Sequence, residues 1–195
     1  YPFVEAAGGE TAGLLGALAR HACVIVADDF PVRECPSELE TVAEHAPVLV
    51  ERVDSNGLLP MRAADRAFTT AFSLRAFLQK NLRPHLQEFP ARNPLSRLDL
   101  PRLRSLPGEI AQQWPAASEG VLSGDVSGLP IDHSVAPSHI RGGPVAARKR
   151  LRAFVREDLS RYAAARNHPD EDATSGLSRY LHCGHVSVHE VFDAV

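Results

Sequence analysis

Prolines interrupt the middle of this chain at irregular intervals and divide it into three segments of different character. Seven of them lie at positions 90, 94, 101, 107, 115, 130 and 137. Because proline removes a backbone donor and fixes φ, neither a long helix nor a central strand can cross such a stretch. We therefore predict a linker over residues 91–137, between an α/β domain over residues 1–90 and a helical domain over residues 138–195. The single tryptophan, Trp114, is expected to anchor this linker by packing.

The first segment alternates helical and extended patterns. The run Cys23–Ala27 is short, continuous and apolar, which is typical of a strand covered on both faces. A second strand is predicted over Val48–Val53, and helical patterns precede the two strands at residues 12–22 and 37–44. This order predicts parallel strands joined by helical crossovers, as in part of a Rossmann-like α/β domain. A further amphipathic helix is predicted over 63–82, with one apolar face formed by Ala64, Phe68, Phe72, Leu78 and Leu82.

The ends of the chain suggest an internal segment of a longer protein. Two strands do not form a stable sheet alone, so further strands are expected upstream. The chain opens at Tyr1, and its last residues, 188–195, have helical spacing without a stop signal.

Composition narrows the class of protein. No apolar run approaches the roughly 18 residues that a membrane helix needs. The net charge of −3 argues against a surface that binds nucleic acid throughout, although a local basic patch stays open. The three cysteines, Cys23, Cys35 and Cys183, include no CxxC pair, so neither disulfides nor a zinc knuckle are expected. We expect a monomeric, cytoplasmic protein with no membrane partner.

The last segment is predicted to be helical and locally basic. Pro144 stands at a helix start, and apolar residues follow it at helical spacing. A basic helix face is often only solvated, but in an acidic chain this concentration indicates where a polyanion would bind. The basic residues, set against Glu157 and Asp158, are Arg141, Arg148, Lys149, Arg150, Arg152, Arg156, Arg161 and Arg166.

Three hydroxyl residues follow Pro169 within a short stretch: Thr174, Ser175 and Ser178. We expect the next helix to begin at Thr174 and Ser175, with Ser178 one turn in. The N–H groups and the positive dipole end of a helix suit a phosphate there. The alternative is that Thr174 or Ser175 simply caps the helix.

A cluster of histidines, His182, His185 and His189, raises the question of a metal site. Gly184 is predicted to end one helix, and Ser187 with Glu190 forms a capping box that opens the next. Because this break separates His182 from His189, no metal site is predicted.

The residues from Tyr162 to Val191 resemble the FAD-binding signature of the photolyase and cryptochrome family. The matching elements are Tyr162, Arg166, Pro169, Thr174–Ser178 and Tyr180–Ser187. Upstream, Val24–Pro31 and Val53–Pro60 look like the class II branch of this family, which repairs cyclobutane pyrimidine dimers.

The resemblance implies that residues 138–195 begin an all-helical FAD-binding domain. It assigns FAD contacts to Tyr162, Thr174, Ser175, Gly176, Leu177 and Ser178, whose hydroxyls and backbone N–H groups would hold the diphosphate. Arg166 matches a position associated with contact to DNA. The implied activity is that of a deoxyribodipyrimidine photo-lyase, a carbon–carbon lyase. Excited reduced flavin gives one electron to a pyrimidine dimer flipped out of DNA, the dimer splits, and the electron returns.

Further FAD contacts and the electron-relay residues of the family lie beyond this segment. The chain alone is therefore expected to bind FAD poorly and to be inactive, and the segment does not specify an antenna chromophore. Two alternatives stay open: a cryptochrome-like blue-light receptor without repair activity, and a non-catalytic protein with a degenerate FAD motif. The second alternative draws on Arg179, where the signature usually has proline, and on Cys183, where an aromatic residue is common.

Overall fold

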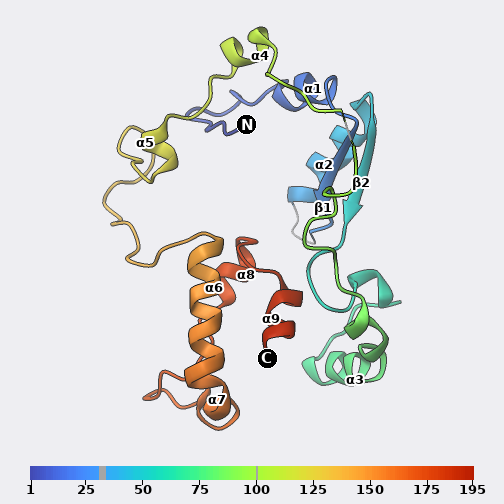
Figure 1. Cartoon of the computed structure of the whole chain (residues 1–195), viewed down its shortest axis with the longest axis vertical. Helices are drawn as coiled ribbons and strands as arrows, with labels where there is room; N and C mark the ends of the chain where they lie inside the picture. The colour runs from blue at the N-terminus through green and yellow to red at the C-terminus, as the bar shows by residue number, and fades with distance from the viewer. Residues whose placement is uncertain (31–33, 100) are drawn as a thin grey trace. The chain divides into compact units, whose positions relative to one another are not determined.

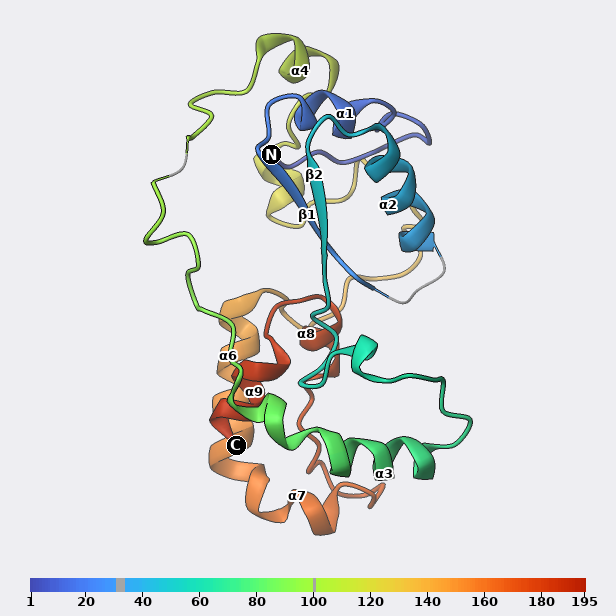
Figure 2. The ribbon, with the colours of Figure 1, turned by 90° about the vertical axis from the view of Figure 1, so that its right-hand side faces the viewer.

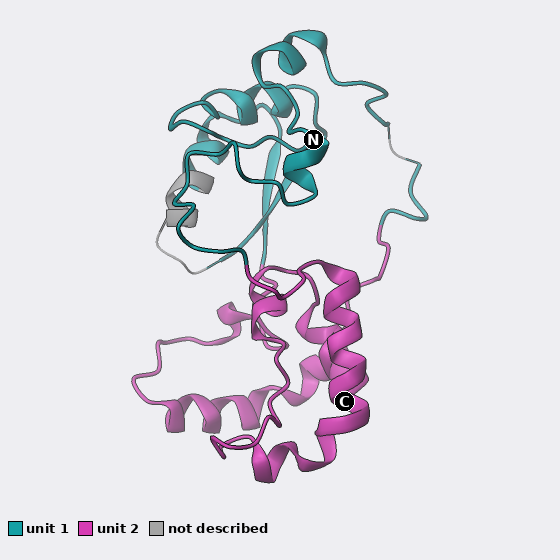
Figure 3. Ribbon diagram, turned by 90° about the vertical axis from the view of Figure 1, so that its left-hand side faces the viewer, with its two compact units in different colours: residues 1–53, 95–137 teal, residues 54–94, 138–195 magenta. Residues whose placement is uncertain are grey.

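The structure is a computed structural model that describes residues 1–30, 34–99 and 101–195, without the side chains of residues 34–39. Pro31 and the side chain of Cys35 lie outside the described residues. The chain divides into two compact units, each built from two stretches (Figure 3). Unit 1 comprises residues 1–53 and 95–137, and unit 2 comprises residues 54–94 and 138–195. The predicted domain limits, which follow the chain continuously, stay a prediction.

Unit 1 contains a two-stranded parallel sheet with helices, a mixed α/β arrangement. Strand β1 (Val24–Asp28) pairs in parallel with β2 (Leu49–Val53), and helix α2 (Glu34–His45) joins the two (Figures 1 and 2). The register aligns Val24 with Leu49. The predicted parallel order of the two strands, with a helix between them, is confirmed.

The faces of this sheet differ from the prediction that β1 is covered on both sides. Exposed and half-buried residues alternate along β1, and Val26 is 61% exposed. The register places Val24 beside Leu49 on the same side of the sheet, and both side chains are exposed. The apolar run thus predicted the strand correctly, but it did not determine which face of the strand is buried.

Residues 95–137 take part in the core of unit 1. They carry helices α4 (Gly108–Gln113) and α5 (Glu119–Leu122). Trp114, only 6% exposed, packs with Ile110 and with Ala17 of helix α1 (Leu14–Ala19). The Trp114 indole N–H also donates a hydrogen bond of 2.8 Å to the carbonyl of Glu10. The predicted anchoring role of Trp114 is confirmed.

Unit 2 is helical in its described residues. One continuous helical run covers residues 144–165, in which a π-helical turn interrupts the α-helix (Figure 1). Pro144 opens this run, as predicted. None of the helices in the described ranges is both long and apolar enough to cross a membrane. The elements are η1 (Met61–Ala63), α3 (Ala71–Asn81), η2 (Arg83–Gln87), α6 (Pro144–Ala153), the π-helix η3 (Phe154–Asp158), α7 (Leu159–Ala165), α8 (Ser178–His182) and α9 (Val188–Ala194).

Helix α3 begins later than predicted. Thr70 has an extended backbone, and its hydroxyl accepts a hydrogen bond from the N–H of Ser73, which caps the helix. Ala64 and Phe68 therefore precede α3, and Phe72 is 83% exposed. The prediction of one apolar helical face over residues 63–82 is wrong, because a local cap set the start of the helix.

The core of unit 2 connects α6 to α8 and to the loop before it. Its buried residues are Ala147, Leu151, Leu177, Tyr180 and Val186. Leu177 is the largest fully buried side chain among the described residues. Its burial draws the loop between α7 and α8 onto helix α6.

Candidate functional site

The hydroxyl-bearing segment Thr174–Ser178 lies mostly in a loop. Helix α8 begins at Ser178, and its N-cap position is Leu177, which makes no side-chain cap bond. Gly176 has φ of 63°, a left-handed conformation that a right-handed helix cannot include. The prediction that the helix begins at Thr174 and Ser175 is therefore wrong, and neither hydroxyl caps α8.

The side chains of this loop divide between the core and the surface. Leu177 is buried, whereas Thr174 and Ser178 are exposed and Ser175 is half-buried. The Ser175 hydroxyl accepts a hydrogen bond of 3.4 Å from the N–H of Leu177. The hydroxyls of Thr174 and Ser178 make no hydrogen bond within the described part of the chain, so both are available to a ligand.

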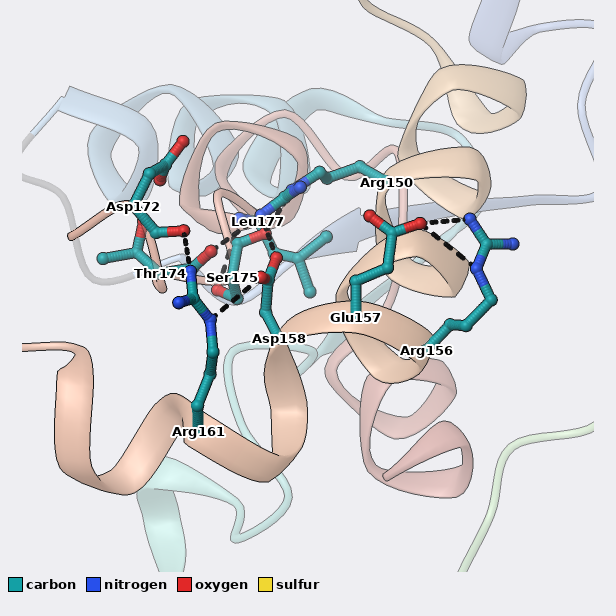
Figure 4. Close-up of polar contacts among 9 residues, drawn as sticks. All are labelled: Arg150, Arg156, Glu157, Asp158, Arg161, Asp172, Thr174, Ser175 and Leu177. Carbon is teal, nitrogen blue, oxygen red and sulfur yellow. Dashed lines mark hydrogen bonds and ion pairs between the residues drawn. The ribbon is translucent and has the colours of Figure 1, made fainter.

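Arg150 of α6 holds the backbone of this loop. Its Nε donates a hydrogen bond of 2.8 Å to the carbonyl of Ser175, and its terminal nitrogen donates one of 2.7 Å to the carbonyl of Thr174 (Figure 4). A Cβ added at Gly176 would lie 3.1 Å from the Arg150 Nε. The absence of a side chain at Gly176 thus permits both the left-handed turn and the close approach of the arginine.

A carboxylate joins Arg150 to a second arginine. Asp158, whose side chain is 14% exposed, lies 3.4 Å from a terminal nitrogen of Arg150 and 3.6 Å from the Nε of Arg161 (Figure 4). Arg161 donates a hydrogen bond of 3.1 Å to the carbonyl of Asp172 and lies 3.6 Å from the carboxylate of Glu171. Together, two arginines and one aspartate bind the loop to the long helical run.

Asp158 closes the π-helical turn η3. Single π-helical turns within α-helices occur frequently at functional sites. In the sequence, Arg150 and Arg161 were identified only as members of a basic segment, and Asp158 only as an acidic residue within it. The three-residue spacing of Asp158 and Arg161 is a detectable pairing signal. The contact of Arg150 with a loop some 25 residues further along the chain has no such signal.

Tyr162 and Arg166 form a separate pair on α7 and just beyond it. The Tyr162 ring lies edge-on to Phe154 at 5.4 Å, and the guanidinium of Arg166 lies 5.5 Å from the centre of the Tyr162 ring. Tyr162 is half-buried and Arg166 is exposed. No hydrogen bond or ring contact joins this pair to the Thr174–Ser178 segment among the residues that the structure describes.

The end of α8 confirms one prediction. Gly184 has φ of 65° and donates a hydrogen bond to the Leu181 carbonyl, while the N–H of His185 donates to the Tyr180 carbonyl. These two bonds form a Schellman motif, so Gly184 ends the helix as predicted. Arg179 lies within α8, which shows that the helix forms without the proline of the signature. Cys183 is exposed and does not take part in the core.

The histidines have individual partners. The Nδ1 of His185 accepts a hydrogen bond of 3.0 Å from the N–H of Gly143, at the start of α6. His189 lies edge-on to Phe89, with ring centres 5.7 Å apart, and His182 is exposed. Within the described ranges, no group of three or more metal-binding side chains occurs.

The predicted capping box before α9 is only half formed. The Ser187 hydroxyl accepts a hydrogen bond of 3.0 Å from the N–H of Glu190, which confirms Ser187 as the N-cap. The Glu190 carboxylate does not return to the Ser187 N–H, because it pairs with the Nε of Arg148 at 2.7 Å. This hydrogen bond, with the charge attraction that accompanies it, raises the pKa of Arg148.

The basic segment does not present one uniform face. Arg150 and Arg161 hold the loop, whereas other arginines line an open groove of about 390 Å³. Three arginines of the basic segment, Arg148, Arg152 and Arg156, line this groove together with apolar side chains. Arg92, Glu190 and Asp193 also contribute to its lining. Fewer basic side chains are thus available to a polyanion than the number of basic residues in the segment suggested.

Comparisons with known proteins bear on the identity of the chain. No known protein-family model matches it. The chain is 29% identical over 168 residues to a protein named deoxyribodipyrimidine photo-lyase from Potorous tridactylus. The alignment covers 84% of this chain and 29% of that protein, so the chain spans less than a third of the relative's length. This similarity supports a relationship to the photolyase family and does not distinguish its branches.

Proposed function

We propose that this chain forms part of a light-driven, FAD-dependent deoxyribodipyrimidine photolyase of the class II branch. Its substrate would be DNA that contains cyclobutane pyrimidine dimers. The similarity to the photo-lyase, which extends over most of the chain, supports this proposal, as does the FAD-binding signature from Tyr162 to Val191. The branch is proposed on the stretches that begin at Val24 and Val53.

The proposal includes the architecture and setting of the protein. The parallel pair β1 and β2, with α2 between them, is compatible with part of a Rossmann-like domain. The helical residues 138–195 would then begin the FAD-binding domain, after a linker over 91–137. We also propose a monomeric, cytoplasmic protein, a setting in which the free cysteines Cys23 and Cys183 would stay reduced.

The observation that carries the proposal is the conformation of the Thr174–Ser178 loop, in particular how its backbone is held. Its exposed hydroxyls stand on a backbone that Arg150 and buried Leu177 hold in place. Hydroxyls on a fixed loop can donate to phosphate oxygens without first losing conformational freedom. We therefore propose that Thr174, Ser175, Gly176, Leu177 and Ser178 bind the diphosphate of FAD.

The two remaining site residues have distinct proposed roles. FAD, when bound, supplies the electron that splits the dimer, and the protein supplies binding and orientation. Tyr162, half-buried beside Phe154, would contact FAD. Arg166 is exposed, and its guanidinium lies over the Tyr162 ring. We propose that this guanidinium contacts a DNA phosphate.

Replacing Ser175 and Ser178 together by alanine tests the FAD site. We expect FAD, titrated into the chain and followed by flavin fluorescence, to bind weakly but saturably. The double substitution should weaken this binding about tenfold or more, because two donors to a charged diphosphate are lost. Ser160→Ala, which removes an exposed hydroxyl of α7, is the matched control.

Riboflavin, which has the same ring system without phosphate, is the control ligand. Its binding should be equal in the unsubstituted chain and in the double variant. Equal FAD affinity in the two proteins would contradict the proposed site and favour a non-catalytic protein with a degenerate motif. A blue-light receptor would keep the FAD site, and only a repair assay on dimer-containing DNA with the longer protein separates it from a photolyase.

A further inference from the structure

We infer that Arg150 is a positioning residue that turns the backbone amides of the loop toward the anion. This inference rests on the proposed function, in which the anion is the FAD diphosphate. The FAD-binding signature contains no position for Arg150, which lies on α6, well before Tyr162. Its role follows from the two carbonyls that it holds.

The geometry of the peptide group gives the direction of the amides. In a planar trans peptide, the carbonyl of one residue and the N–H of the next point in opposite directions. No cis peptide bond occurs in the described ranges. Because the Thr174 and Ser175 carbonyls both point at Arg150, the N–H groups of Ser175 and Gly176 both point away from it.

These two N–H groups are adjacent and aligned. Neither donates a hydrogen bond to any described residue. Successive N–H groups that point the same way, next to a left-handed residue, form a concavity that binds anions, and Gly176 supplies the left-handed residue. The loop thus presents two adjacent amides on the side opposite to the arginine.

Arginine is suited to this task for a geometric reason. Its guanidinium donates from Nε and from a terminal nitrogen at once, at 2.8 and 2.7 Å, which fixes two consecutive peptide groups. Asp158, 3.4 Å away, orients the guanidinium and offsets its charge. A lysine at this position would offer a single flexible ammonium, which cannot fix both carbonyls with the same geometry.

The experiment compares three single variants of the full chain: Arg150→Ala, Arg150→Lys and Arg156→Ala. Arg156 is the matched control, because it also belongs to the long helical run and, among the described residues, pairs with Glu157 alone. The first readout is the NMR order parameter of the Ser175 and Gly176 amides. It should be about 0.85, the value of a rigid backbone, and fall below about 0.6 in Arg150→Ala.

The second readout is FAD affinity, measured as for the serine variants. Arg150→Ala should weaken FAD binding about tenfold, because the amides must then be ordered when the ligand binds. Arg150→Lys should recover part of both effects, and Arg156→Ala should change neither. Far-UV circular dichroism establishes that each variant is folded. Asp158→Asn, which retains Arg150, is a fourth variant, and its expected loss of amide order is smaller than that of Arg150→Ala.

The outcomes separate this inference from the proposed function. Unchanged order parameters in Arg150→Ala, or an equal loss in Arg156→Ala, would overturn the positioning role. If the unsubstituted chain binds no FAD while only Arg150→Ala and Asp158→Asn loosen the amides, the FAD proposal fails and Arg150 still positions the loop. If Arg150→Ala loosens the amides but leaves FAD affinity unchanged, Arg150 positions the loop without contributing to FAD binding, and its proposed role in binding is refuted.

Discussion

Trp114→Ala is expected to lower the free energy of unfolding of unit 1 by about 3–5 kcal/mol. The indole is almost fully buried against Ile110 and Ala17, and its N–H bonds to the Glu10 carbonyl. Alanine would leave a cavity and an unpaired carbonyl. Since domains are stable by only about 5–15 kcal/mol, the loss is a large fraction of the total.

Urea unfolding followed by far-UV circular dichroism measures this effect, because the substitution removes the only tryptophan. Trp114→Phe is the control that separates packing from hydrogen bonding. It retains an aromatic ring and loses the bond to Glu10, so it should cost less than the alanine variant. A Trp114→Ala protein as stable as the unsubstituted chain would show that residues 95–137 do not depend on this contact.

Leu177→Ala should lower the free energy of unfolding of unit 2 by about 2–5 kcal/mol. Leu177 is 2% exposed and packs with Leu151 of α6 and Tyr180 of α8. Truncation would open a cavity where the loop meets the long helical run. The same urea measurement applies, and the cost depends on how far the neighbouring side chains can close the cavity.

Leu181→Ala is the matched control, since Leu181 lies in α8 but is 39% exposed. Its substitution should cost clearly less, because less apolar surface leaves the core. An equal cost at the two positions would mean that Leu177 does not hold the loop. Because Leu177 also fixes the backbone next to Gly176, its substitution should weaken FAD binding as well, whereas Leu181→Ala should not.

The candidate site lies within unit 2 and depends on contacts made inside that unit. Only unit 2 contains the proposed FAD residues, and there the site depends on polar contacts between distant stretches of chain. The hydroxyls alone do not form it. Arg150, Asp158 and Arg161 connect this loop to the long helical run through hydrogen bonds and ion pairs (Figure 4). Family signatures that record only ligand-contacting residues pass over such supporting side chains.

Local sequence signals determined much of this protein. The parallel strand order, the helix start at Pro144, the Schellman motif at Gly184, the cap at Ser187 and the packing of Trp114 were all predicted. Each depends on a residue type acting on its own backbone or on a strong apolar driving force. The sequence also singled out the hydroxyl residues Thr174, Ser175 and Ser178, whose role in binding stays a prediction.

Tertiary structure alone decided how these residues are presented. It placed Thr174 and Ser175 in a loop, because Gly176 adopts a left-handed turn and Arg150 donates hydrogen bonds to the carbonyls of Thr174 and Ser175. It also diverted Glu190 from its capping box to Arg148, and left Val26 exposed on a sheet predicted to be covered. Contacts between residues distant in the chain leave no periodic pattern in the sequence, so only the folded structure reveals them.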